Sequence, residues 1–186
     1  MEDEVSRPFW GALRYVMKKH DATHLHYDLR LEFNGVLLSW AISKDLNCRA
    51  GIDHEAVEMD DHRVEHLLFE GLHHTGTIMV WDRGTWKPHS ECDDIRDSLR
   101  KGRLKFTLCG EKLKGDWLLI RTDNLKNAPR VTWILRKEAD SFAESDTDPS
   151  ICERFPNSIL TGRTMEEITE DWTTPRGKSD RQGTLF

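Results

Sequence analysis

The sequence predicts a mainly β protein, and three observations support this prediction. Residues 24–33 alternate between apolar and polar side chains, which is the period-two pattern of a strand with one buried face. Asn34-Gly35 follows, and a second β-like run starts directly after it, as in a two-residue hairpin. Further β-like runs are TIMVW (77–81), RLKFTL (103–108), DWLLIR (116–121) and RVTWILR (130–136).

Turns and one short helix separate these runs. The helix is expected after the capping box Ser90-Glu91-Cys92-Asp93, because Ile95 and Leu99 are four residues apart and Gly102 can end it. The expected turns are DRG (82–84), GEKLKG (110–115) and Asn-Ala-Pro (127–129).

The apolar periodicity fades beyond about residue 138. We therefore expect a domain over residues 1–140 and a C-terminal tail over 141–186. A capped start at Thr164-Met165-Glu166-Glu167 predicts a short docking helix in this tail, over 165–171.

Composition narrows the possible classes of protein. The 186 residues suit one domain, and seven Trp and seven Phe argue against disorder. No stretch approaches the roughly 20 apolar residues of a membrane span, and MEDEVSRPFW is too acidic for a secretory signal. The four Cys form no C-x-x-C pair, which fits reduced thiols. A cytoplasmic protein without a membrane partner is expected.

The predicted hairpin creates an unusual polar face. With Asn34-Gly35 as the turn, cross-strand pairing puts His26 opposite Ser43, Asp28 opposite Ala41 and Arg30 opposite Ser39. Each polar side chain thus faces a small one, which leaves room for an ion. The same register puts Lys44 on the apolar side, so a bulge or strand end near Ser43 is expected to turn Lys44 to the polar face.

Three residues of this region are candidate metal ligands. His26 and Asp28 are two apart on a strand and can point to one site, and His20 can complete a set of three. Two imidazoles and a carboxylate leave positions open for water and substrate, and such nitrogen and oxygen ligands suit Mn, Fe or Zn. The alternative is a set of solvated side chains on an edge strand.

Three further residues are candidates for contact with a phosphate. Arg30 and Lys44 supply a planar fork and a point charge. His62, beside Asp60 and Asp61, can donate a proton to a leaving oxygen. Taken singly, each is also explained as an ordinary surface residue.

The segment KKHDATHLHYDLRLEFNGVLLSWAISK (18–44) resembles the signature of the 3′-phosphoesterase domain of bacterial ATP-dependent DNA ligase D and its free-standing relatives. The resemblance continues at DDH (60–62), FEG (69–71), MVWDRGTW (79–86), LKFTLCGEKLKGDWLLIR (104–121) and ILTGRTMEEI (159–168). It implies a compact closed or nearly closed β-barrel of about eight strands, with one or two short helices and a polar interior. Such domains hold a divalent metal, usually Mn²⁺, with Zn²⁺ or Co²⁺ as alternatives.

The implied activity is healing of 3′ ends of DNA or RNA-tipped DNA in strand-break repair. Such enzymes remove a 3′ phosphate and can trim a terminal ribonucleoside. The implied partners are DNA 3′ ends and a separate DNA ligase, polymerase or end-binding protein, with association with the nucleoid during repair. Carried over by position, the metal ligands are His20, His26 and Asp28, and the residues at the scissile phosphate are Arg30, Lys44 and His62.

The chain departs from the family pattern at three places. His54 stands where the family has an arginine, and His66 stands where it has a tyrosine. Both are candidate phosphate-binding residues, although a histidine cannot reproduce a bidentate fork. Only LHHTG (72–76) replaces a longer family segment. These changes put the balance of monoesterase and diesterase activity in question and are compatible with a weakened enzyme.

Two other functions fit parts of the sequence. An iron(II) oxygenase would join His26 and Asp28 with a downstream His62 or His66. A non-catalytic nucleic-acid-binding repair module is suggested by 13 Lys or Arg against 8 Asp or Glu in residues 82–136. Its stacking platforms would be Trp81, Trp86, Trp117 and Trp133, which a barrel core explains equally well.

Overall fold

The computed structural model describes residues 12–43, 46–122 and 129–173, and these contain nine strands, three helices and one 3₁₀ turn. The strands are β1 Leu13–Asp21, β2 Leu25–Phe33, β3 Val36–Ser43, β4 Asp53–Arg63, β5 Gly71–His73, β6 Gly76–Pro88, β7 Arg103–Gly110, β8 Lys114–Arg121 and β9 Thr132–Lys137. The helices are α1 Ile95–Lys101, α2 Ile151–Arg154 and α3 Met165–Thr173, and the 3₁₀ turn η1 is Val64–His66.

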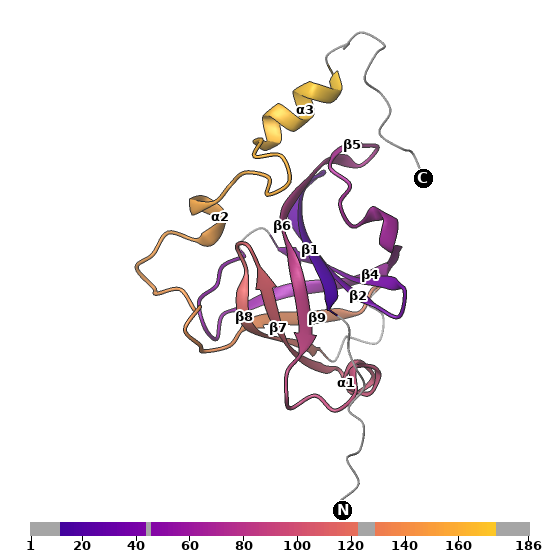
Figure 1. Ribbon diagram of the computed structural model, residues 1–186, viewed down its shortest axis with the longest axis vertical. Coiled ribbons are helices and arrows are strands. Elements are labelled where there is room, and N and C mark those ends of the chain that lie inside the picture. The colour runs from indigo at the N-terminus through magenta and orange to yellow at the C-terminus, as the bar shows by residue number, and fades with distance from the viewer. Residues whose placement is uncertain (1–11, 44–45, 123–128, 174–186) are drawn as a thin grey trace, which may run out of the picture.

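Eight of the strands close into an antiparallel barrel (Figure 1). Their order is β1-β2-β3-β4-β9-β8-β7-β6, and pairing of β1 with β6 closes the ring. The short strand β5 pairs only with β6 and lies outside the ring. The expected mainly β barrel of about eight strands is therefore confirmed, with three short helices in place of one or two.

The hairpin of β2 and β3 has the predicted register. His26 pairs with Ser43, Asp28 with Ala41 and Arg30 with Ser39. Asn34 and Gly35 have φ angles of 50° and 80°, which a type I′ turn requires at both central positions. Lys44 lies outside the described residues, so its predicted turn to the polar face stays a prediction.

The barrel interior is apolar. One cluster of buried side chains joins residues from all eight barrel strands, which can meet only in the enclosed space. In β1 and β2 the inward residues are alternate ones, and the polar residues between them point outward. The polar interior that the family resemblance implied is thus wrong for this chain. The four candidate stacking residues also belong to the core, each at most 3% exposed: Trp81, Trp86, Trp117 and Trp133.

Two local expectations differ from the structure. The DRG segment is no turn, because β6 runs through it and Gly84 pairs with both β1 and β7. A side chain on Gly84 would overlap the carbonyl of Cys109, so this glycine allows close strand packing. Helix α1 begins later than expected, because Asp94 caps it by accepting a hydrogen bond from the Asp97 amide.

The segment after β9 packs along the barrel and carries α2 and α3 (Figure 1). Ile151, Met165 and Ile168 are buried in the main core, and α3 lies against β5 and β6. The helix expected over 165–171 corresponds to α3, whereas the division at residue 140 stays a prediction. No helix among the described residues has both the length and the apolar character of a membrane span.

Candidate functional site

A pocket of about 740 Å³ lies on the outer face of β1, β2, β3 and β4. Its floor is formed by polar residues of these strands. Residues of the segment 64–75 line the opposite side, and we call this segment the roof segment. Leu67 packs the roof segment onto Val16 and Val80 in a second, smaller apolar cluster. The floor is therefore buried although it belongs to the outside of the barrel: Lys18 is 1%, Arg30 6% and Asp28 8% exposed.

Lys18 attaches the roof segment to the barrel. Its Nζ donates hydrogen bonds to the carbonyls of His66 and Phe69, at 2.6 and 2.9 Å. Burial and the positive charge of Arg30 lower the pKa of Lys18 to about 7. The lysine is thus a buried donor rather than a solvated surface cation.

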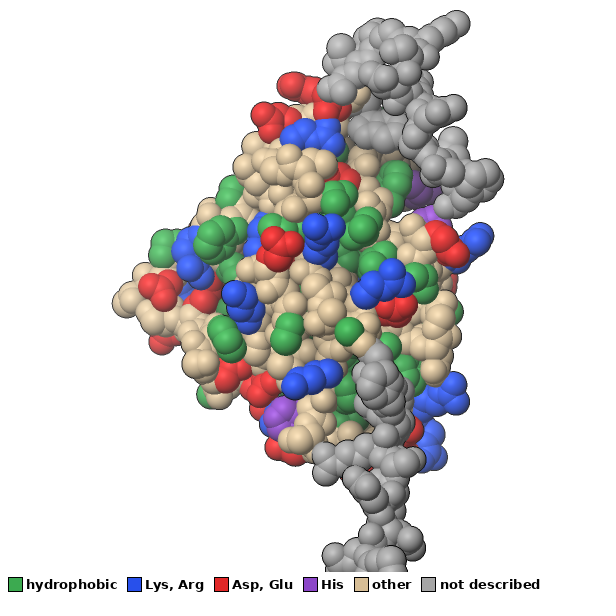
Figure 2. All heavy atoms as spheres, in the orientation of Figure 1, with side chains coloured by type: hydrophobic (Ala, Val, Ile, Leu, Met, Phe, Trp, Pro, Cys, Tyr) green, Lys and Arg blue, Asp and Glu red, His purple; other side chains and the backbone are tan. Residues whose placement is uncertain are grey.

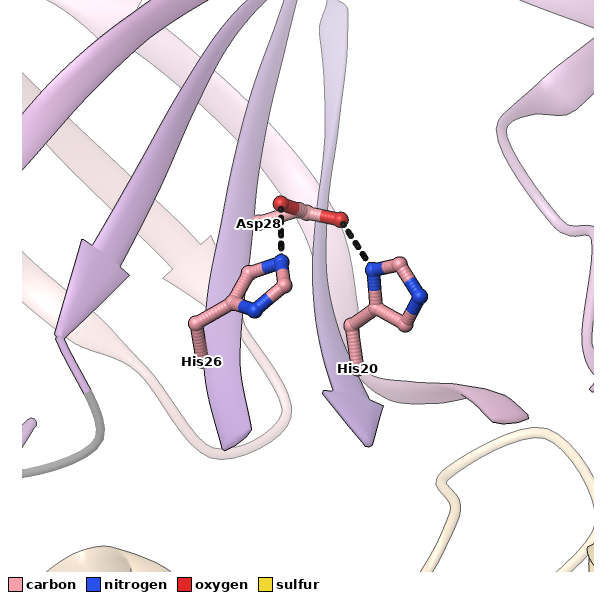
Figure 3. Close-up of side chains that lie close together, drawn as sticks. All are labelled: His20, His26 and Asp28. Carbon is pink, nitrogen blue, oxygen red and sulfur yellow. Dashed lines mark ion pairs between the residues drawn. The ribbon is translucent and has the colours of Figure 1, made fainter. Parts of the chain in front are cut away.

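The three candidate metal ligands converge (Figure 3). The Nδ1 atom of His20 lies 3.7 Å from Asp28 Oδ2, and the Nε2 atom of His26 lies 3.4 Å from Asp28 Oδ1. One donor atom from each residue lies within 4.8 Å of the other two. Among the described residues this is the set of His, Cys, Asp and Glu with such spacing, and neither His62 nor His66 belongs to it. The iron(II) oxygenase alternative required His62 or His66 as its third ligand, and neither lies in this cluster.

The remaining ring nitrogens have their own partners. His26 Nδ1 lies 2.9 Å from the carbonyl of His24, which accepts only, so the nitrogen carries the proton and leaves Nε2 for a ligand. His20 Nε2 lies 3.1 Å from Thr75 Oγ1, which leaves Nδ1 free to face Asp28. Such outer contacts are the usual means of orienting metal-binding imidazoles.

The donor set fits a divalent cation. Ligand distances of about 2.0–2.2 Å from a metal separate neighbouring ligand atoms by roughly 3.0–3.6 Å. The spacing of 3.4 Å falls in this range and that of 3.7 Å lies just above it, and both are long for direct hydrogen bonds. Burial alone would raise the pKa of Asp28, but His20, His26 and then Arg30 lower it well below its ordinary value. The carboxylate is therefore ionised over the physiological range, as a ligand must be.

Arg30 lines the pocket, and one nitrogen of its guanidinium group has no hydrogen-bond partner. Its Nε is buried without a hydrogen-bond partner, and its Nη2 lies 3.8 Å from Asp28 Oδ2. A buried donor without an acceptor is costly, so its presence points to a ligand with acceptor oxygens. Burial lowers the pKa of Arg30, but an arginine stays charged.

His62 reaches the same pocket with a defined orientation. Ser39 Oγ lies 3.0 Å from both the Leu37 carbonyl and His62 Nδ1. Because the hydroxyl has one proton and donates it to the carbonyl, His62 Nδ1 must donate to Ser39. Nε2 is then the atom available to a ligand. Burial and the charge of Arg30 lower the pKa of His62, so the ring is neutral in the free protein at pH 7.

The other predicted substrate residues have different outcomes. His66 lines the pocket from the roof segment. His54 does not line it: this residue is 3% exposed and lies on the core-facing side of β4. A β4 bulge between Met59 and His62 changes which residues face outward, so His54 and His62 lie on opposite faces. The prediction that His54 contacts the substrate is therefore inconsistent with its buried position outside the pocket.

Sequence reasoning missed Lys18, Thr75 and His73 as site residues. Lys18 precedes His20 by two positions, so the strand pattern could have placed both on one face. His73 is the last residue of β5 and Thr75 lies in the β5–β6 turn, and no local pattern connects this hairpin with β1. Their position depends on the pairing of β1 with β6, which a sequence pattern does not reveal.

The fold and the pocket define a class: a β-barrel protein whose outer pocket has a buried floor containing Lys18 and Arg30, beside a cluster of candidate metal ligands. A family model of the DNA ligase D 3′-phosphoesterase domain matches residues 18–121, which include the whole floor. The chain belongs to this family.

Several multifunctional proteins are similar to the chain. It is 40% identical to the multifunctional non-homologous end joining protein LigD of Pseudomonas aeruginosa, over 93% of the chain. It is 34% identical to the LigD protein of Mycobacterium tuberculosis and 37% identical to that of Mycolicibacterium smegmatis, over 59% of the chain in both cases. The matched regions are 21%, 14% and 15% of these proteins, so the chain spans only a minor part of their length.

Proposed function

We propose that the chain is a metal-dependent phosphoesterase that heals 3′ ends of DNA or RNA-tipped DNA during non-homologous end joining. It would remove a 3′ phosphate and trim a terminal ribonucleoside, leaving a 3′ hydroxyl. Family membership and the names of the relatives support this proposal. The observation that carries it is the buried, unpaired Arg30 nitrogen beside the His20, His26 and Asp28 cluster.

The residues that would hold the metal are His20, His26 and Asp28. Mn²⁺ is proposed first, with Zn²⁺ or Co²⁺ as alternatives, since all of them accept imidazole and carboxylate ligands. A divalent ion bound there would neutralise charge on the phosphate oxygens and favour ionisation of water.

The chain's own residues would bind the phosphate and move one proton. Arg30 donates to the phosphate oxygens through its free Nε, and the adjacent buried floor strengthens this attraction by excluding water. His62 is held through Nδ1 by Ser39. A bound phosphate anion raises the pKa of His62, so Nε2 takes up a proton. As water attacks phosphorus and the bond to the 3′ oxygen breaks, His62 Nε2 donates this proton to the leaving oxygen, and the attacking water gives up one proton to the released phosphate or to solvent.

The proposed partners are DNA 3′ ends, with a separate DNA ligase, polymerase or end-binding protein acting before or after the reaction. The proposed location is the cytoplasm, at the nucleoid during repair. His66 would contact the substrate from the roof segment, and Lys44 stays a proposed phosphate ligand without a described position.

A primer with a 3′ phosphate and one with a single 3′ ribonucleotide test the proposal. Each is incubated with the protein and Mn²⁺, Zn²⁺ or Co²⁺, and phosphate release and primer length are measured. Wild type should act on at least the 3′-phosphate primer, and H20A, H26A, D28A and H62A should lose this activity. Salt-dependent binding without any product, unchanged in H26A, would instead support a nucleic-acid-binding repair module.

A further inference from the structure

A chain of hydrogen bonds connects the candidate ligand His20 to the β5–β6 turn. The Nε2 atom of His20 lies 3.1 Å from Thr75 Oγ1, and the same hydroxyl lies 3.0 Å from His73 Nδ1. Thr75, in the turn, and His73, the last residue of β5, both line the pocket. The threonine is thus shared by two imidazoles, one of which belongs to the proposed metal site.

The backbone fixes the turn beside His20. In the pairing of β1 with β6, His20 is opposite Ile78 and Asp21 is opposite Thr77. Gly76 has a φ of 138°, and a side chain on it would overlap the backbone carbonyl of Asp21. This close approach places Thr75 at the end of β1, next to His20. The contact is therefore built into the strand pairing rather than made by a free side chain on a loose loop.

The direction of the hydrogen bonds through the Thr75 hydroxyl decides which nitrogen of His20 is available to a metal. A hydroxyl has one proton, so the two contacts can be satisfied in either of two directions. If His20 Nε2–H donates to Thr75, the hydroxyl donates to His73 Nδ1, and His20 Nδ1 keeps its lone pair. If the direction is reversed, His20 Nδ1 carries the proton toward Asp28. A cation held between this nitrogen and the Asp28 carboxylate needs the lone pair on Nδ1, so the first direction is the one that metal binding requires.

The state of His73 agrees with this direction. Burial lowers its pKa, as do the positive charges that His74 and His20 would carry when protonated. A neutral His73 can accept the threonine proton through Nδ1. His73 also contacts the ring of His74, with the two centroids 3.9 Å apart.

We propose that Thr75, supported by His73, is a positioning residue that holds His20 with Nδ1 toward the metal. This inference rests on the metal site of the proposed function. Thr75 does not touch the substrate or the metal; it fixes the orientation and the tautomer of a ligand. Removal of such an outer hydrogen bond typically weakens metal affinity about 10- to 100-fold.

The experiment measures metal affinity directly. Mn²⁺ is titrated into the metal-free protein, and free Mn²⁺ is followed by electron paramagnetic resonance. Thr75→Val should weaken binding about 10- to 100-fold, whereas Thr75→Ser, which keeps the hydroxyl, should stay within about threefold of wild type. Thr23→Val is the matched control, because Thr23 lines the same pocket. Its affinity should equal that of wild type.

A second measurement requires no variant. In the Zn²⁺-loaded wild type, ¹⁵N chemical shifts of the His20 ring should show a protonated Nε2 and a ligated Nδ1. A ligated Nε2 overturns the assignment, as does a Thr75→Val variant that binds Mn²⁺ as tightly as wild type. Either result leaves the metal site itself intact. Wild type that binds none of Mn²⁺, Zn²⁺ and Co²⁺ overturns the metal site and this inference together.

Discussion

The two faces of β1 and β2 are built by alternate residues of the same strands but serve different purposes. Tyr15, Met17, Tyr27 and Leu29 point into the barrel and are at most 1% exposed. The residues between them point outward and form the pocket floor: Lys18, His20, His26, Asp28 and Arg30. Figure 3 shows His20, near the end of β1, and His26, near the start of β2, converging on the Asp28 carboxylate.

The comparison shows how a barrel without a polar interior can still hold a buried polar site. The interior stabilises the fold through apolar burial, and the roof segment shields the outer polar face from water. Elsewhere on the outside, charges are mixed: the face drawn in Figure 2 carries cations and anions side by side. Several cations from the basic stretch 82–136 are paired with acids, including Arg83 with Glu111 and Lys105 with Glu91. A desolvated floor, not a broad basic surface, distinguishes the site.

The largest expected effect is a loss of activity caused by a substitution on the outer face. Asp28→Asn removes the charge that connects His20, His26 and Arg30 while keeping the shape of the side chain. Phosphate release from a 3′-phosphate primer should fall by more than about 10³-fold, which corresponds to about 4 kcal/mol of barrier. Initial rates at saturating Mn²⁺ measure it.

Glu32→Gln is the matched control for Asp28→Asn. Glu32 lies on the same face of β2 but pairs with Arg14, at 2.7 Å, outside the pocket. Its activity should stay within about twofold of wild type, because exposed ion pairs contribute little. Comparable losses in both variants would refute a special function for the pocket face.

The second largest effect is a loss of stability caused by a substitution on the inner face. Leu29 follows Asp28 directly, is fully buried and points the other way. Leu29→Ala should lower the free energy of unfolding by about 2–5 kcal/mol through lost burial and a cavity. Under conditions where the variant is folded, its Mn²⁺ affinity should stay within about threefold of wild type. Urea unfolding and a metal titration test both parts, and a folded variant without metal binding would show that the faces are coupled.

Local sequence patterns were sufficient for the hairpin and its polar face. Period-two alternation and Asn34-Gly35 fix the register of β2 and β3, so the residues that share the face follow directly. The register of β2 and β3 does not reveal whether this face points into the barrel or outward. That depends on closure of the ring by β1 and β6, where a register shift follows Met17.

Bulges and turns that depend on distant partners were not predictable. The bulge in β4 puts His54 and His62 on opposite faces of the strand, although the sequence makes both candidates for contact with phosphate. The DRG segment looks like a turn, but β1 and β7 pair with it on both sides and extend the strand. In both cases tertiary pairing decides the local structure. The strand pattern can place Lys18 on the same face as His20, but nothing local shows that the roof segment covers it.

A third, smaller effect concerns pH and the lysine beneath the roof segment. Because the folded-state pKa of Lys18 is lowered to about 7, the unfolded chain binds more protons between pH 7 and about 10.5. Stability from this group therefore rises with pH across that window, by up to about 3 kcal/mol between pH 7 and 9.5. Lys18→Met should flatten this rise relative to wild type.

Urea unfolding of both proteins at several pH values measures this difference. Subtracting the two profiles removes the contributions of the other titrating groups, including Lys112, whose pKa burial lowers to about 8. Parallel profiles would show that Lys18 titrates as a solvated lysine and does not hold the roof segment as a buried donor.

The smallest expected effect concerns the turn that sets the polar face. Gly35 has a φ of 80°, and a Cβ there would meet no other atom within 4 Å, so any cost of Gly35→Ala comes from backbone strain alone. We expect a loss of about 1 kcal/mol in the free energy of unfolding, read from urea or thermal melts. Mn²⁺ affinity should not change, because the eight cross-strand pairs of β2 and β3 hold the register once the barrel is closed. If affinity falls together with stability, the turn itself positions His26 and Asp28, and the two faces are less independent than the alternation of their residues indicates.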